Sequence, residues 1–157
     1  MQRRGAAVLA VLLVSVVLQG CPHPIFSSWI IEAYAPGETV ESVATDLPNL
    51  ALEAGIVELE EDHRDRSYWE KDIPPRQRRI RYTGRTMLDR ALAEVIVVDL
   101  GRGAGFRFVF SGDADDEDGI KLVMADLMRI LTDRFGWMNV AFSSGLLQSK
   151  WQAEEEM

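Results

Sequence analysis

Two strongly apolar segments separated by a glycine-rich pentapeptide give the clearest indication of how this chain folds. Residues 94–100 (EVIVVDL) and 106–110 (FRFVF) have the β-branched and aromatic composition of strands, and residues 101–105 (GRGAG) lie between them. Glycine permits the tight reversal of a hairpin, so we predict two antiparallel strands. Three phenylalanines alternate along the second strand and share one face, which we expect to be the buried one: Phe106, Phe108 and Phe110.

A second pattern, periodic at helical spacing, covers residues 120–135. Its apolar stripe consists of Ile120, Val123, Met124, Leu127, Leu131 and Phe135, and charged residues fall on the opposite side. Gly136 is expected to end this helix. We therefore predict an α+β fold, a mostly antiparallel sheet with one or two helices packed on one face, which is a two-layer sandwich.

Shorter segments complete the predicted domain. The further expected strands are residues 29–34, 56–60, 78–83 and 137–142. A helix is expected over residues 38–54, kinked or split by Pro48, with Asp46 capping its second part and Gly55 ending it. Residues 86–93 (TMLDRALA) fit either a short helix or the start of a strand, and both interpretations stay open.

The first twenty residues have the three parts of a secretory signal. Arg3 and Arg4 precede the run 6–18, which is apolar except for Ser15, and Gly20 is the small residue that follows. A helix that crosses a hydrocarbon core of about 30 Å needs roughly 20 residues, more than this run supplies. We therefore expect residues 1–20 to be cleaved off rather than to span a membrane.

The motif Leu18-Gln19-Gly20-Cys21 follows directly and contains the only cysteine of the chain. It resembles the lipobox of bacterial lipoprotein precursors, although Gln19 stands where Ala or Ser is usual. The resemblance covers residues 1–21 and implies cleavage before Cys21, with acyl chains on its thiol and on the new amino terminus. A lone cysteine makes no internal disulfide, and two or more acyl chains anchor a protein stably. The alternative is an ordinary secreted protein with a stray thiol near a conventional cleavage site.

The same resemblance bears on location and domain organisation. Pro22 stands where an Asp tends to hold lipoproteins at the inner membrane, which favours the outer membrane, facing the periplasm. Residues 21–28 would then be the lipidated cysteine and a short tether that keeps the domain close to the bilayer. A single domain is expected over 29–145, followed by a loose acidic tail over 146–157.

The net charge of the chain after removal of the predicted signal limits the kinds of partner that it can bind. Loss of Arg3 and Arg4 with the signal lowers the basic residues from 17 to 15, against 25 acidic ones, for a net charge of about −10. This charge argues against a nucleic-acid-binding protein and against a surface that lies flat on anionic lipid. The remaining chain is long enough for one domain with its own core.

No segment carries a specific catalytic, cofactor or metal motif. The glycines of 101–105 precede a strand, whereas a dinucleotide loop needs a helix directly after them. The acidic run 113–119 (DADDEDG) has the wrong spacing for an EF-hand, since the closing glutamate would fall on Ala125. His23 and His63, with a single thiol, make no zinc set. We expect no cofactor and no metal, and carboxylate pairs leave a periplasmic hydrolase as one alternative.

One cluster of basic residues, with no acidic residue between them, remains as a candidate site for partner binding: Arg76, Arg78, Arg79, Arg81 and Arg85. In one interpretation it is a solvated strand face, neutralised by the acidic segment 58–72, an exposed loop closed by Pro74-Pro75. In the other it docks an anionic partner such as lipid headgroups, cell-wall polymer or an acidic protein patch, because arginine binds carboxylate and phosphate bidentately.

Together these features favour a lipid-anchored envelope protein that acts by binding, in a structural or assembly role, and not by catalysis. Its partners would be the membrane, through the lipid on Cys21, and an envelope protein or anionic polymer. A periplasmic inhibitor or immunity-type lipoprotein is the alternative, because a small acidic domain close to the membrane suits that role as well.

Overall fold

The structure, a computed structural model, describes residues 27–65, 67–88, 90–112 and 114–144. Its strands are β1 (Ser27–Pro36), β2 (Ile56–Glu61), β3 (Arg79–Thr86), β4 (Leu92–Asp99), β5 (Gly103–Gly112) and β6 (Val140–Ser144). Its helices are α2 (Val40–Glu53) and α3 (Glu117–Phe135), with 3₁₀ turns η1 (Tyr68–Glu70), η2 (Ala114–Asp116) and η3 (Trp137–Asn139). The predicted signal, Cys21 and the tail 146–157 lie outside the described residues.

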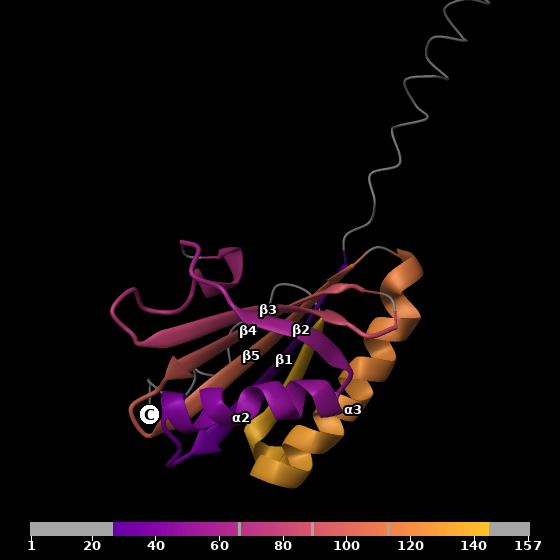
Figure 1. The fold of residues 1–157 in the computed structure, drawn as a ribbon. Coiled ribbons are helices and arrows are strands. Elements are labelled where there is room, and N and C mark those ends of the chain that lie inside the picture. Colours follow the sequence, from indigo (N-terminus) through magenta and orange to yellow (C-terminus); the bar gives the residue numbers. More distant parts are fainter. Residues whose placement is uncertain (1–26, 66, 89, 113, 145–157) are drawn as a thin grey trace, which may run out of the picture.

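The six strands form one sheet in the order β2-β3-β4-β5-β1-β6, and every neighbouring pair is antiparallel. Helices α2 and α3 pack on the same face of this sheet (Figure 1). The predicted α+β class is therefore confirmed. The first strand, β1, lies between β5 and β6, so the beginning of the domain is held in the interior of the sheet.

The main core lies between the sheet and the two helices. Phe106, Phe108 and Phe110 point into it from β5, as their alternation predicts, and each is at most 1% exposed. Leu127 of α3 is fully buried in the same cluster, and Gly136, with a φ of 86°, ends the helix. The predicted hairpin is also confirmed, but its turn is shorter than residues 101–105, because β5 begins at Gly103 and Asp99 pairs with Ala104.

Helix α2 is continuous through Pro48, so the prediction of a split helix is wrong. Pro48 is exposed, and the buried residues before and after it belong to one stripe: Val40, Val43, Leu47, Leu50 and Ala51. Packing of that stripe on a single core keeps both halves in one helix despite the hydrogen bond that proline removes. Thr39 caps the helix by accepting the amide of Ser42, and Asp46 pairs with Arg134 of α3 instead of capping.

Residues 86–93 comprise the end of β3, the reversal to β4 and the first residues of β4, which resolves the ambiguity of this segment. Arg85 pairs with Leu92 in the register of the two strands, so the chain must turn within residues 86–91. The Thr86 hydroxyl accepts the amide of Ala91 at 2.9 Å and closes the turn. The strand expected at 137–142 starts later, at Val140, because Trp137–Asn139 forms a 3₁₀ turn.

The segment between β2 and β3 covers the face of the sheet opposite the helices (Figure 1). We call residues 62–65 and 67–78 the strap. The prediction of an exposed loop over residues 58–72 is only partly right: His63, Arg64, Tyr68 and Lys71 are exposed, but 58–61 belong to β2 and Glu70 is 1% exposed. Ile73 of the strap packs with Ile96 and Val98 of β4 in a second, smaller apolar cluster. The strap is therefore packed on the sheet through these buried residues.

Candidate functional site

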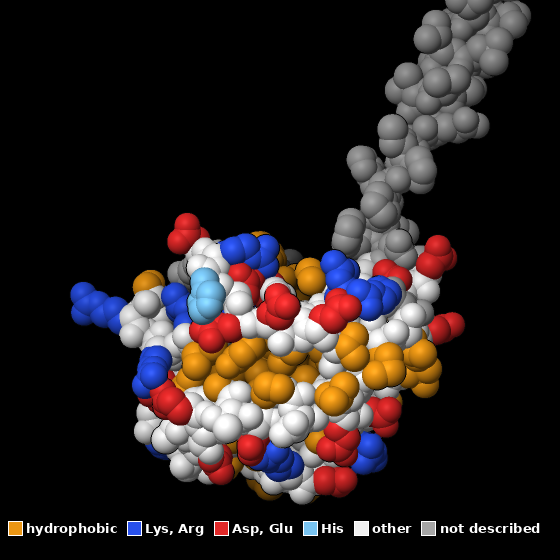
Figure 2. All heavy atoms as spheres, viewed as in Figure 1, with side chains coloured by type: hydrophobic (Ala, Val, Ile, Leu, Met, Phe, Trp, Pro, Cys, Tyr) orange, Lys and Arg blue, Asp and Glu red, His pale blue; other side chains and the backbone are white. Residues whose placement is uncertain are grey.

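The five arginines of the basic cluster do not share one exposed surface. Arg79 and Arg81 lie on the strap face of β3 and are mostly buried, with 21% and 6% of their side chains exposed. Arg76, Arg78 and Arg85 are exposed. On the visible face of the molecule, basic side chains are interspersed with acidic ones instead of forming a patch (Figure 2).

Glu70 joins the strap to β3 by binding two of these arginines. One of its carboxylate oxygens accepts a hydrogen bond from Nη1 of Arg81 at 2.5 Å, and the other lies 2.7 Å from Nε of Arg79. Glu70 also accepts the backbone amide of Ser67 at the start of η1, which fixes its position. Burial of an unpaired carboxylate costs free energy, so Glu70 is stable at this position only while it binds the two arginines. These contacts therefore hold the strap on the sheet.

Asp62 supplies a second carboxylate to Arg81. Its Oδ2 lies 3.3 Å from Nε of Arg81, and both of its oxygens accept Nε of Arg64 at 2.9 Å. The hydrogen bonds from Arg64 hold the pKa of Asp62 well below its ordinary value, although burial acts in the opposite direction. Arg81 also donates to the backbone carbonyl of Arg64, so the first residues of the strap are tied to the same guanidinium.

Arg107 of β5 provides the other attachment of the strap. It binds both oxygens of Asp72 at 2.7 and 2.8 Å, donates to the carbonyl of Trp69 at 2.7 Å, and reaches Glu32 of β1 at 2.8 Å. Burial tends to raise the pKa of Asp72, but the hydrogen bonds and charge of Arg107 outweigh it, and that pKa is lowered. The network therefore extends from β3 across the sheet to β1.

The interpretation in which the acidic segment 58–72 neutralises the arginines is right for Arg79 and Arg81, which pair with Glu70 and Asp62, but wrong in expecting a solvated face. Sequence reasoning did not find that the network is buried, although one signal for it was present. Arg81, Ile96, Arg107 and Glu32 are register partners in one row across four strands, on the face away from the helices. Ile96 and Val98 lie on the same face and favour burial, and charged side chains buried beside them must be paired. That pattern indicates a covered polar face, but it does not show which segment covers it.

The exposed arginines lie at opposite ends of β3. Arg78 precedes the strand and pairs with Glu41 of α2, and Arg76 is exposed beside it. Arg85 lies at the other end, where its Nη1 donates to the carbonyl of Arg90 at 3.1 Å. At about 3.3 Å per residue, Arg78 and Arg85 lie roughly 20–25 Å apart. A single small ligand cannot bridge that distance, so the two ends of the strand are separate surfaces.

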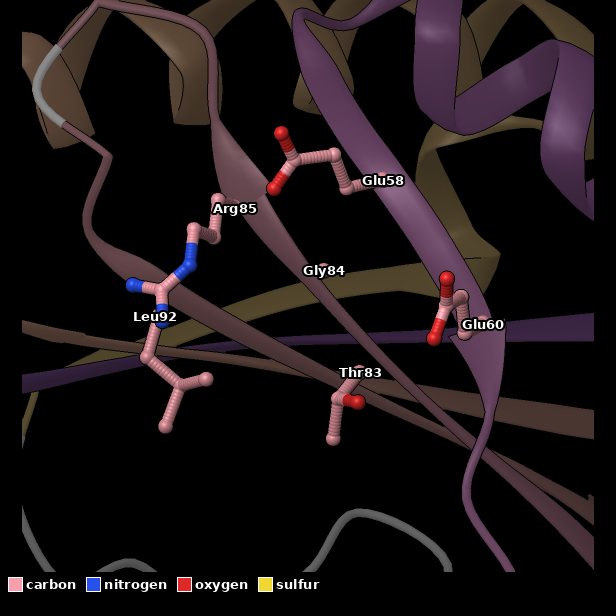
Figure 3. Close-up of a pocket in the computed structure, with 6 residues that line it drawn as sticks. All are labelled: Glu58, Glu60, Thr83, Gly84, Arg85 and Leu92. Atoms are coloured by element: carbon pink, nitrogen blue, oxygen red, sulfur yellow. The ribbon is translucent and has the colours of Figure 1, made fainter.

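An open pocket of about 260 Å³ lies at the Arg85 end. Figure 3 shows Glu58 and Glu60 of β2 and Arg85 of β3 around it, and Thr83, Gly84 and Leu92 complete its lining. Glu58 is engaged by Arg90, whose Nη2 donates to both carboxylate oxygens at 2.8 and 2.9 Å. Both partners have left-handed backbone angles, with φ of 55° and 59°, which non-glycine residues adopt at an energetic cost. The pocket offers charged and hydroxyl groups to a small polar ligand but does not exclude water.

The described residues contain neither a metal-ligand cluster nor a membrane-spanning helix. Within the described ranges, no group of three or more His, Cys, Asp or Glu side chains is placed to hold a metal ion. In that part of the chain, no helix has both the length and the apolar character needed to cross a bilayer. His63 is an exposed strap residue whose Nδ1 lies 3.6 Å from Glu61.

The sequence and the fold give no relative from which a function can be taken. No protein-family model matches the chain, and neither curated proteins nor solved structures gave a match.

Proposed function

We propose that the protein is a lipid-anchored protein of the bacterial cell envelope that acts by binding a partner protein and not by catalysis. The anchor would be Cys21 in the outer membrane, with the domain facing the periplasm, and it rests on the lipobox-like residues 18–21. The observation that supports a binding role is the composition of one end of the sheet, the end farthest from Ser27, where the described domain begins.

This remote end is defined by the direction of the strands. Strand β1 runs from Ser27 to Pro36, and the carbonyl of Arg102 accepts the amide of Gly37 there. The first residue of β6 pairs with Ala33, which brings the preceding turn η3 to the same end. The side chain of Gln77 donates to the carbonyl of Asp99, which places the residues before β3 there as well. The exposed side chains of the remote end include Arg76, Arg78, Arg102, Trp137 and Met138, beside the acidic Glu38, Glu41 and Asp99.

The chemistry of the remote end matches that of a protein interface. Trp137 is 76% exposed and Met138 69% exposed, which is unusual for side chains of this size. Tryptophan, methionine and arginine are the residues enriched in the centres of protein interfaces, and tryptophan and arginine carry much of the binding energy. We expect a partner that has an apolar pocket for Trp137 and acidic groups for the guanidinium groups.

Cross-linking in cells, followed by co-purification from detergent-solubilised membranes, tests this binding role. Wild-type protein should recover a defined partner, and the double variant Trp137→Ala, Arg76→Gln should lose it. The matched control is Lys121→Gln, an exposed charge change on α3, which should retain the partner. Recovery of the same proteins by the double variant and by wild type would refute the assignment of the remote end.

The anchor is tested separately by the intact mass of the protein from membranes. We expect residues 21–157 with acyl chains attached, and we expect Cys21→Ser to leave the membrane fraction. A wild-type protein without acyl chains would contradict the proposed anchor, whatever the result at the remote end.

A further inference from the structure

Four large apolar side chains are exposed at the end of the sheet where the described domain begins, and we call this the anchor end. They are Met87, Leu88, Leu92 and Leu122, with exposed fractions of 54%, 62%, 41% and 60%. Leu92 pairs with Ser111, which pairs with Ser28 at the beginning of β1. Helix α3 follows closely after Gly112, the register partner of Ser27, so Leu122 lies in its first half at the same end.

Contacts between the elements bring together the segments that carry three of these side chains. The amide of Met87 donates to the carbonyl of Gly55 at 2.8 Å. Gly55 in turn lies against Val123, the neighbour of Leu122 in α3. The reversal between β3 and β4 therefore meets the first half of α3. Figure 2 shows hydrophobic side chains on the surface beside α3, with acidic ones near its start.

We propose that the anchor end rests on a lipid surface of neutral headgroups, with Met87, Leu88 and Leu122 entering the interfacial layer. This inference rests on the proposed lipid anchor at Cys21. Six residue steps separate Cys21 from Ser27, so the chain between them spans at most about 20 Å. Leu92 lies two strands from β1, about 10 Å away, which is within that reach. The anchor end therefore faces the bilayer, and weak apolar contact suffices because the tether keeps the local concentration high.

Charge decides which lipid surface fits. Asp115, Glu117 and Asp118 lie at the start of α3, beside the apolar side chains. Among the cations of this end, Arg90 is paired with Glu58 and Lys121 with Glu117, and Arg85 donates to the carbonyl of Arg90. Anionic headgroups would be repelled by this surplus of acids, whereas neutral headgroups leave the apolar contact unopposed. The contact is expected to be insensitive to salt on neutral lipid and weaker when anionic lipid is added.

A fluorescence experiment on the lipidated protein in vesicles tests this orientation. Because Cys21 carries the lipid, Leu88→Cys supplies a single free thiol for an environment-sensitive label, and Arg102→Cys at the remote end is the matched control. Both sites are exposed, so neither label disturbs the core. On vesicles of zwitterionic lipid we expect quenching by aqueous iodide to be about threefold weaker at position 88 than at position 102. Spin-labelled lipid should quench position 88 only.

Equal quenching of the two positions in protein that carries its acyl chains would overturn the lipid contact and leave the proposed anchor standing. Absence of acyl chains on Cys21, read from the intact mass, would overturn both. Stronger protection of position 88 when 30% of the lipid is anionic would refute the assignment to neutral headgroups.

Discussion

Removal of the negative charge of Glu70 is expected to destabilise the protein severely, because this carboxylate holds the strap to the sheet. Glu70→Gln keeps the shape of the side chain but presents an amide to two guanidinium groups. Its oxygens accept Arg81 at 2.5 Å and contact Arg79 at 2.7 Å, and its side chain is only 2% exposed. A hydrogen bond to a charged group contributes about 1.5–3 kcal/mol, and loss of one partner of a buried pair costs about 3–5 kcal/mol.

We therefore expect Glu70→Gln to lower the free energy of unfolding by about 3–5 kcal/mol, a large part of the roughly 5–15 kcal/mol of a typical domain. Urea unfolding followed by circular dichroism measures this directly. With a slope of about 2 kcal/mol per molar urea, the midpoint should fall by roughly 1.5–2.5 M.

The matched control is Glu60→Gln, a change of the same type on the neighbouring strand β2, where the side chain is exposed. Its midpoint should equal that of the wild type. A Glu70→Gln midpoint within error of this control would refute the conclusion that the strap is held by a buried ion-pair network.

Three further predictions concern the core, the hairpin and acid stability. Leu127→Ala empties a fully buried site and should lower the free energy of unfolding by roughly 2–5 kcal/mol, whereas Lys121→Ala, on the exposed side of α3, should leave the urea midpoint unchanged. Equal losses of stability in the two variants would contradict the assigned helical face. Gly103→Ala places a Cβ 2.4 Å from a carbonyl oxygen of β1, so the melting temperature of the variant should fall by an amount equivalent to about 1–3 kcal/mol. An unchanged melting temperature would show that β1 and β5 can move apart to accommodate the methyl group. The lowered pKa of Asp72 adds stability that is complete above its unfolded pKa of about 3.9 and is lost as the pH falls through its folded pKa. Asp72→Asn should therefore be less stable than wild type at pH 7, and the difference should shrink below about pH 4. A difference that stays constant with pH would contradict this linkage.

The helix-facing half of the fold was predictable because its signals are local. The alternation of Phe106, Phe108 and Phe110 assigned a buried strand face from five residues, and Gly136 marked the end of α3. Such patterns need no knowledge of the partner, since any apolar layer satisfies them. Pro48 misled the prediction of α2, because the local loss of one hydrogen bond is outweighed by packing on both sides of it.

The strap was not predictable in the same way, because its burial depends on partners far away in the sequence. Glu70 lies in a charged segment whose composition predicts exposure. It can be buried because its carboxylate pairs with Arg79 and Arg81 of β3. Trp69 and Ile73, two apolar residues within that stretch, were the available hint that it packs against something. The pocket was equally hidden, since no sequence pattern reports the left-handed backbone of Glu58.

The position of β1 in the sheet has a consequence for the order of folding. The strand lies between β5 and β6, with Ile31 paired to both Phe108 and Phe142. Among the described residues, the first strand to be synthesised therefore cannot be fully paired until the last strand has been made. Closure of such long loops is slow, because its entropy is lost before the contacts are gained. Strands β3, β4 and β5 are joined by short turns and are expected to form first. A chain that crosses a membrane before it folds, as the proposed secretory signal implies, would keep this sheet incomplete during export. It would pair β1 with β5 and β6 only after crossing the membrane.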